Sequence, residues 1–219
     1  MIIERITSEL GLSEQYVAKI AQTASHRYKT YEIPKTTGGT RTINHPAREL
    51  KLLQSWLADR VFSLLPVHAA AFAYRKGRNI LAHAAVHVRQ NYLLKVDFRD
   101  FFPSITGADV EVLLRRNETI FNPRMDGLDY QLIKSLVCRR DRLTIGAPSS
   151  PSLSNAVMFE FDVHWQEVSR SEEVVYSRYA DDLYFSTNAP NVLSRLLSQP
   201  WARARTDPPV LSKNDPGSL

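Results

Sequence analysis

Two adjacent carboxylates, Asp181 and Asp182, lie between two strand-forming runs, and this arrangement constrains the fold more than any other feature of the chain. Residues 174–179 and 183–187 are rich in β-branched and aromatic side chains, which predicts two antiparallel strands joined by a tight turn. Asp is common in turns, so a plain surface turn is one interpretation of the pair. The other interpretation is a functional site at the tip of a hairpin.

A further strand-forming run ends on a third carboxylate. Residues 92–97 predict a buried strand whose last residue is Asp97. A carboxylate bordered by apolar residues is costly unless it is paired or bound to a metal. If this strand lies beside the hairpin, Asp97 and Asp181 come together. Such a cluster would hold two Mg²⁺ ions, because Mg²⁺ takes few protein carboxylates and adds substrate phosphates.

The remaining elements alternate irregularly, which favours an α+β fold over a doubly wound parallel sheet. The chain has no run of about 18 apolar residues and only one cysteine, so we expect no membrane span and a cytoplasmic location. The other predicted elements are a helix capped by Ser13, a hairpin over 31–43, a helix from Pro46 to Pro66, a helix capped by Asn79, a helix with a Thr106/Asp109 capping box, and a helix over 152–169.

Charge is divided unevenly along the chain, whose formal net charge is +5. Residues 1–96 carry 14 basic and 6 acidic side chains, whereas residues 97–199 carry 11 basic and 15 acidic ones. This split predicts that the first part binds a polyanion and the second part binds cations. Scattered surface charge is the alternative.

Four segments resemble the motifs of bacterial reverse transcriptases, most closely those of the retron type. Tyr179-Ala180-Asp181-Asp182 resembles the family's Tyr-x-Asp-Asp box, and residues 95–105 resemble its first-aspartate motif. Residues 143–155 resemble its Gly-Ala-Pro-x-Ser-Pro loop, and Arg41-Thr42-Ile43 followed by Leu50-Lys51 resembles its fingers motif. Because the four occur in the family's order, chance is a poor explanation.

The resemblance implies a right-hand polymerase fold, with fingers, a partial palm built on an antiparallel sheet with packed helices, and no thumb. We therefore expect the chain to be truncated after the Tyr-x-Asp-Asp box. The domains this predicts are an N-terminal helical segment (1–30), fingers (31–91), a partial palm (92–199) and a disordered or unrelated tail (200–219).

By the same resemblance, Asp97 and Asp181 are ligands of two Mg²⁺ ions and Asp182 completes the catalytic cluster. Phe102 matches the position of the family's aromatic steric gate. A ring there would clash with a ribose 2′-hydroxyl, so the resemblance implies a preference for deoxynucleotides. Packing in the core is the alternative role for Phe102.

The resemblance also implies three kinds of contact to substrate. Cations in the fingers would meet the triphosphate, small residues in the loop would let the backbone approach the nucleotide, and a basic cluster would grip the template backbone. A solvated hairpin, a plain turn and ordinary surface charge are the respective alternatives. The predicted nucleotide-binding residues are Lys35, Arg41, Gly146, Ala147 and Pro148, and the predicted nucleic-acid-binding residues are Arg75, Lys76 and Arg78.

Two positions depart from the family's pattern. Ile145 stands where many relatives carry Gln. His83 and His87 fall on the family's Asn-Ala-x-x-His element, but His83 replaces the Asn. Helix packing is the alternative role for both histidines, and a metal site there is disfavoured because no third ligand is evident.

The function that the resemblance implies is RNA-directed DNA polymerase activity. Its partners would be an RNA template and non-coding RNA, the DNA product, dNTPs and an effector protein of unknown identity, with a family-level expectation of antiviral defence. Two alternatives stay open: an RNA-binding fragment that cannot hold a primer and template, and an enzyme of the group II intron or diversity-generating type. An RNA-dependent RNA polymerase is disfavoured by Phe102.

Overall fold

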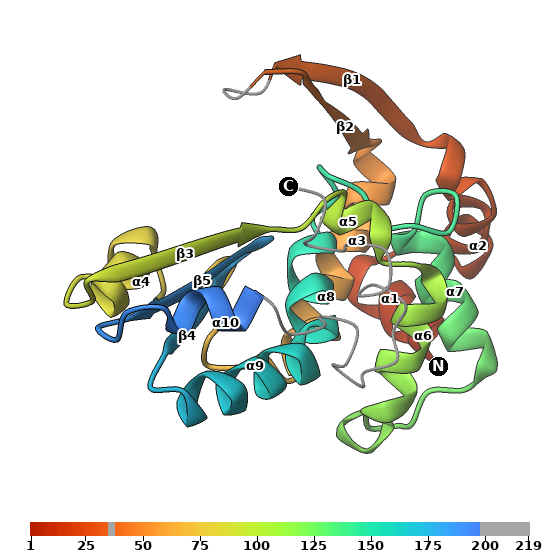
Figure 1. Ribbon diagram of the computed structural model, residues 1–219. Helices are drawn as coiled ribbons and strands as arrows, with labels where there is room; N and C mark the ends of the chain where they lie inside the picture. Colours follow the sequence, from red (N-terminus) through yellow and green to blue (C-terminus); the bar gives the residue numbers. More distant parts are fainter. Residues whose placement is uncertain (35–37, 198–219) are drawn as a thin grey trace. The chain divides into compact units, whose positions relative to one another are not determined.

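The computed structural model describes residues 1–34 and 38–197 (Figure 1). The chain folds into two compact units, each built from two separated stretches. Unit 1 comprises Met1–Leu65 and Phe102–Leu153, and unit 2 comprises Pro66–Phe101 and the described residues from Ser154 onward. The predicted division into fingers and palm stays a prediction, and the predicted tail at 200–219 lies outside the described residues.

Unit 1 is a cluster of helices with a two-stranded ribbon. Its α7 contacts α1, α2, α3 and α6, so α7 lies at the centre of the helical cluster. The strands β1 and β2 pair antiparallel and form an exposed ribbon (Figure 1). The bounds are α1 (Ile2–Leu10), α2 (Glu14–Thr23), η1 (Ala24–His26), β1 (Tyr28–Pro34), β2 (Thr40–Pro46), α3 (Arg48–Arg60), η2 (Phe62–Leu64), α6 (Gly107–Arg116), η3 (Glu118–Ile120) and α7 (Gly127–Val137).

Local sequence signals account for where these helices begin. Ser13 Oγ accepts a hydrogen bond from Tyr16 N at 3.2 Å, so Ser13 caps α2 as predicted. Thr106 and Asp109 form the predicted capping box of α6. The apolar stripes of these helices then pack together in the core of unit 1, which includes Ile6, Val17, Ile20, Leu50, Leu53, Leu57, Val110, Leu114, Ile133 and Leu136.

Unit 2 is a three-stranded antiparallel sheet between helices, in the strand order β3-β5-β4. Because side chains alternate along a strand, Phe185 and Ser186 of β5 face opposite sides of the sheet. Trp165 of α9 packs on Phe185, and His87 of α4 bonds Ser186, so α9 and α4 cover opposite faces. The bounds are α4 (Ile80–His87), β3 (Tyr92–Asp97), α9 (Phe159–Ser171), β4 (Val175–Tyr179), β5 (Asp182–Thr187) and α10 (Val192–Leu197).

The observed elements confirm the predicted α+β class and correct three of its details. The strand over 92–97 is an edge strand in which only Val96 is buried, so the prediction of a buried strand was wrong. The predicted helix over 152–169 is broken at Met158 into α8 (Ser150–Val157) and α9. The helix predicted from Pro46 to Pro66 begins only at Arg48, because Pro46 ends β2, and its regular part ends at Arg60, after which the 3₁₀ turn η2 follows.

The chain passes between the units after residues 65, 101 and 153, and the last two of these points fall inside short helices. These are α5 (Phe101–Ser104) and α8.

Cys138, the single cysteine of the chain, is a free thiol and is buried. None of the helices described in residues 1–34 and 38–197 combines the length and the apolar character that crossing a lipid bilayer requires.

Candidate active site

The three predicted catalytic carboxylates all belong to unit 2 and meet at one end of its sheet. β3 and β5 are antiparallel, so the last residue of β3, Asp97, has the first residue of β5, Asp182, as its Cα partner. Asp181 directly precedes that pair, and its carbonyl accepts a hydrogen bond from Phe98 N at 3.2 Å. The predicted meeting of the two strand ends is therefore observed, with Asp97 in register with Asp182 and not with Asp181.

The turn that carries Asp181 has an unusual backbone conformation. Tyr179, the last residue of β4, pairs with Asp182, the first residue of β5, so only Ala180 and Asp181 form the turn. Ala180 has φ 59°, which is left-handed. A non-glycine residue in that region costs on the order of 1–3 kcal/mol and persists only where its surroundings hold it.

Lys95 is a neighbour of the cluster that we did not predict. Its Nζ lies 2.9 Å from Asp182 Oδ2, and this hydrogen bond raises the pKa of Lys95. Lys95 is two residues before Asp97, so the alternation of the strand places both on one face. The Lys95 side chain is 51% exposed, so water screens the pair and its contribution to stability is small.

Two buried histidines of α4 pack on the face of the sheet that carries Asp182. His83 Nε2 lies 2.7 Å from Ser177 Oγ, and His87 bonds Ser177 Oγ at 2.6 Å and Ser186 Oγ at 2.7 Å. Burial, and then the neighbouring His83, lower the pKa of His87 to about 4. His87 is thus neutral at pH 7, and helix packing is the role observed for both rings.

The carboxylate cluster fits magnesium in the type of its ligands. Mg²⁺ prefers oxygen ligands and is held in nucleotide enzymes by one or two carboxylates plus substrate phosphates. Asp97 on the end of β3 and Asp181 in the adjoining turn supply two such groups. Within residues 1–34 and 38–197, no three His, Cys, Asp or Glu side chains are grouped so as to hold a metal by themselves. The fit therefore rests on a pair of carboxylates completed by substrate.

The predicted nucleotide-binding loop lies in unit 1 against the β1–β2 ribbon. Asn44 N donates to Ile145 O at 2.8 Å, which joins the loop to β2. Gly146 has φ 108°, and a Cβ atom there would lie 2.9 Å from Asn44 O. Gly146 is therefore required by local packing. Ala147 is buried and Pro148 is half-buried, and nucleotide binding by the three residues stays a prediction.

Two of the other predicted nucleotide-binding residues, Arg41 and Phe102, also belong to unit 1. Arg41 is exposed on β2, with Ile33 of β1 as its Cα partner. Phe102 is half-buried, and its carbonyl accepts a hydrogen bond from Ile105 N at 3.1 Å. Lys35 lies outside the described residues. The roles of all three at a triphosphate or sugar stay predictions.

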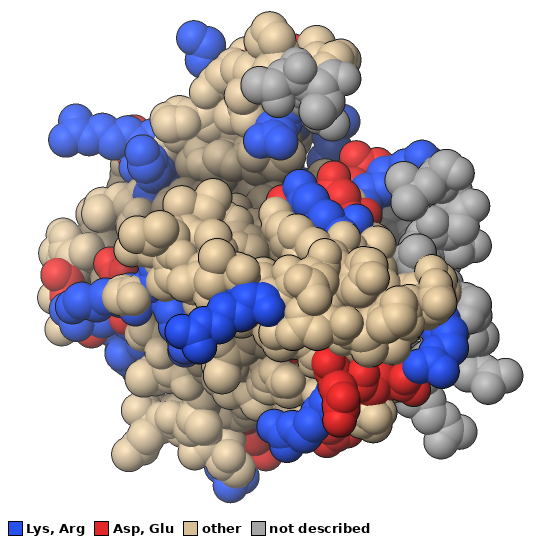
Figure 2. Space-filling model, turned by 60° about the vertical axis from the view of Figure 1, so that its left-hand side comes forward, with Lys and Arg blue, Asp and Glu red and all other residues tan. Residues whose placement is uncertain are grey.

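The predicted template-binding cluster belongs to unit 2, and two of its three cations have contacts within that unit. Arg75 Nη1 donates to His68 O at 2.9 Å and to Ala71 O at 3.1 Å. The Arg78 guanidinium lies 4.5 Å from the centre of the Phe72 ring, and Lys76 is exposed. On the face drawn in Figure 2, Lys and Arg side chains form separate groups among uncharged ones. Template binding by the cluster stays a prediction.

Comparison with known proteins places these observations in a family. The model of the reverse transcriptase (RNA-dependent DNA polymerase) family matches residues 33–206. The retron Ec73 reverse transcriptase of Escherichia coli is 40% identical over 168 residues, which cover 73% of this chain and 53% of that protein. The retron Mx162 reverse transcriptase of Myxococcus xanthus is 35% identical over 227 residues, covering 94% and 44%.

Among solved structures, telomerase from Candida albicans in complex with a fragment of telomeric RNA matches with a TM-score of 0.44 and 13% identity, over 84% of this chain and 43% of that one. The chain spans about half the length of the curated relatives it matches. The family match includes the loop, the first-aspartate motif and the Tyr-x-Asp-Asp box, so the resemblance predicted from these motifs is confirmed. The chain belongs to the reverse transcriptase (RNA-dependent DNA polymerase) family, and within that family it is similar to the retron enzymes.

Proposed function

We propose that Asp97, Asp181 and Asp182 form the catalytic centre of a retron-type RNA-directed DNA polymerase. The reaction is attack of a primer 3′-hydroxyl on a dNTP, directed by an RNA template. The observation that carries the proposal is the strand register, which places Asp97 at the end of β3 opposite Asp182, next to Asp181 in the β4–β5 turn. Membership of the reverse transcriptase family supports the class of substrate.

Asp97 and Asp181 are the residues that would hold Mg²⁺. When bound, two Mg²⁺ ions activate the attacking hydroxyl and stabilise the leaving pyrophosphate. The protein contributes position and charge: the paired strand ends fix Asp97, and the tight turn fixes Asp181. Asp182 adds a third negative charge, which Lys95 balances at 2.9 Å.

The proposal includes contacts to substrate beyond the carboxylates. Phe102 selects deoxynucleotides by its bulk, and Lys35 and Arg41 meet the triphosphate. The loop of Gly146, Ala147 and Pro148 approaches the nucleotide, and the cluster of Arg75, Lys76 and Arg78 holds the template backbone. A non-coding RNA, an effector protein and a part in antiviral defence are further expectations for retron-type enzymes.

The test is extension of a DNA or RNA primer on an RNA template by the whole chain, with dNTPs and Mg²⁺. Asp97→Asn and Asp181→Asn should each lower kcat by on the order of 10³-fold or more, because each removes a charge that the metal requires. Asp59→Asn, which changes an exposed carboxylate on α3, is the matched control and should leave the rate unchanged.

Two outcomes would count against the proposal. Persistent extension by Asp97→Asn would remove this residue from the catalytic centre. A folded wild-type chain that binds RNA and extends no primer would exclude polymerase activity for this chain and favour the RNA-binding alternative.

A further inference from the structure

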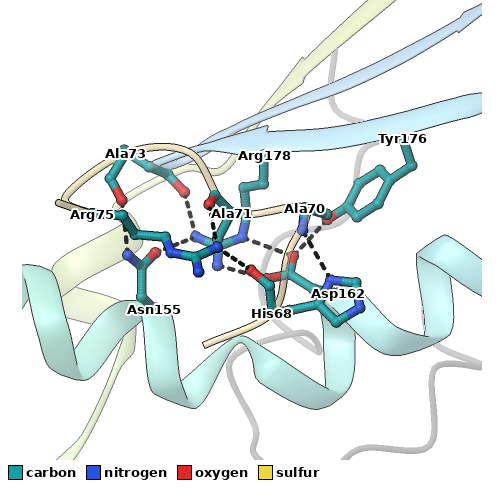
Figure 3. A network of polar contacts seen from close by, with 10 residues as sticks. His68, Ala70, Ala71, Ala73, Arg75, Asn155, Asp162, Tyr176 and Arg178 are labelled. Carbon is teal, nitrogen blue, oxygen red and sulfur yellow. Dashed lines mark hydrogen bonds and ion pairs between the residues drawn. The ribbon is translucent and has the colours of Figure 1, made fainter. Parts of the chain in front are cut away.

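A fully buried ion pair joins β4 to α9 in unit 2 (Figure 3). Arg178 of β4 and Asp162 of α9 both have 0% exposed side chains. Arg178 Nε donates to Asp162 Oδ1 at 2.8 Å, and Nη2 donates to Oδ2 at 2.7 Å. Tyr176 adds a hydrogen bond from its hydroxyl to Asp162 Oδ1 at 2.7 Å. The carboxylate therefore holds the guanidinium in one plane and one orientation.

The third nitrogen of the guanidinium, Nη1, bonds the candidate catalytic turn. Arg178 Nη1 donates to Ala180 O at 2.9 Å and to Asn155 Oδ1 at 3.1 Å. Ala180 is the left-handed residue of the turn, and its carbonyl belongs to the peptide group that leads into Asp181. One fixed guanidinium thus bonds directly to the peptide that sets the direction of the Asp181 backbone.

The backbone of Arg178 is held as firmly as its side chain. Its N–H donates to Ala70 O at 2.8 Å, and its carbonyl accepts from Phe72 N at 2.8 Å. This short parallel bridge covers the outer edge of β4. Asn155, which receives one of the guanidinium bonds, donates to Ala73 O at 2.9 Å and so links α8 to the same segment (Figure 3).

Stability alone does not account for this arrangement. A buried ion pair loses so much hydration that apolar residues of the same volume often give an equal or greater stability. An apolar pair, however, has no donor for the carbonyl of Ala180. Burial lowers the pKa of Arg178, but the adjacent Asp162 carboxylate and the Tyr176 hydroxyl together raise it by more, so the guanidinium stays charged.

We propose that Arg178, oriented by Asp162, is a positioning residue that clamps the Ala180 carbonyl and thereby fixes the turn that presents Asp181. The clamp concerns the conformation of the turn alone, and only its consequence for catalysis rests on the proposed function. The two can therefore fail separately.

The first test is Arg178→Lys, which keeps the charge and the pairing with Asp162. A single ammonium group cannot reproduce the fork of the guanidinium, so the bond to Ala180 O is lost. In the whole chain labelled with ¹³C at alanine, we expect the Ala180 carbonyl resonance to shift. We also expect kcat for primer extension to fall by about 10- to 100-fold and the KM for dNTP to change little.

Metal affinity is a property that a purely structural role of Arg178 would leave unchanged. The Mg²⁺ concentration for half-maximal extension and the dissociation constant for Mn²⁺, measured by electron paramagnetic resonance, should both rise several-fold in Arg178→Lys. Tyr176→Phe is the matched control, because it removes a hydrogen bond from Asp162 and leaves the bond from Arg178 to Ala180 intact. It should leave the Ala180 resonance and both metal values unchanged.

If Arg178→Lys does not fold, Asp162→Leu combined with Arg178→Met and Tyr176→Phe replaces the whole network by apolar side chains and serves the same measurements. An unchanged Ala180 resonance in a folded variant would overturn the clamp, and a shifted resonance with unchanged Mn²⁺ binding would overturn its positioning role. Failure of the wild-type chain to extend a primer would contradict the proposed polymerase, while the resonance and the Mn²⁺ binding would still decide the clamp.

Discussion

The neutral ring of His87 gives the protein a stability that depends on pH. The pKa of His87 is about 4 in the folded chain, against about 6.5 for an unperturbed histidine. Between these values the unfolded chain binds more protons than the folded one. The contribution of His87 is therefore fully present above pH 6.5 and is lost as the pH falls toward 4.

We predict that the free energy of unfolding falls by on the order of 2 kcal/mol from this residue between pH 7 and pH 4. Urea unfolding at a series of pH values measures it. His87→Gln should flatten the dependence in this window, whereas His45→Gln, which changes an exposed ring on β2, should not. An equal slope in wild type and His87→Gln would contradict the prediction.

Residue patterns predicted the carboxylates of the site but not their partners. Asp97, Asp181 and Asp182 stand at the ends of strand-forming runs, and that position is visible in the sequence. Arg178 and Tyr176 are two residues apart on β4, so their side chains lie on the same face of the sheet. This spacing indicates that the Arg178 charge is buried, but it does not identify its partner. Asp162 reaches Arg178 from another element, and only the tertiary fold determines that contact.

Among the elements, the loop after α7 depends on one glycine. Gly146 has φ 108°, and a methyl carbon added there would lie only 2.9 Å from Asn44 O, a backbone atom that cannot move aside. Gly146→Ala should therefore lower the free energy of unfolding by about 1–3 kcal/mol. Chemical denaturation of the variant, compared with the wild-type chain, measures this loss.

Gly127→Ala is the matched control for that substitution. Gly127 begins α7, and nothing lies within 4 Å of the position of its added methyl group. The change should be neutral or stabilise the protein by up to about 1 kcal/mol, because alanine is the better helix former. Equal effects of the two substitutions would show that the backbone conformation of Gly146 carries no cost.

Element boundaries were predictable where a side chain fixes them and not elsewhere. Ser13, Asn79 and Thr106 cap their helices through local hydrogen bonds, so sequence alone locates those starts. The break between α8 and α9 at Met158 was not predictable, because no proline or glycine marks it. The exposure of β3 depends on which strand pairs with it, and apolar periodicity does not contain that information.

At the scale of the whole molecule, the two units should respond differently to metal. Both candidate ligands, Asp97 and Asp181, belong to unit 2, so binding should stabilise β3, β4 and β5 and leave the helices of unit 1 unaffected. At about ten times the dissociation constant, Mn²⁺ should stabilise unit 2 by about 1.4 kcal/mol. Amide hydrogen exchange, resolved by peptide, measures both units in one experiment.

Asp97→Asn serves as the control for that measurement and should abolish the effect. Protection that spreads equally over α1, α2 and α7 would contradict a metal site confined to unit 2.

The class of the fold and the location of the carboxylates were predictable from the sequence. The division of each unit into two separated stretches of chain was not predictable, because it depends on how segments distant in the sequence pack together.

Because each unit is built from two separated stretches of chain, the order in which the chain is synthesised on the ribosome affects how the units fold. Unit 1 has all of its chain once residue 153 has emerged, and domains fold as units while synthesis proceeds. β3 is made earlier, yet β5, the strand that pairs with it, is among the last described elements to appear. The nascent chain therefore carries β3 without that partner through much of its synthesis, and the carboxylate cluster can assemble only after unit 1 is complete.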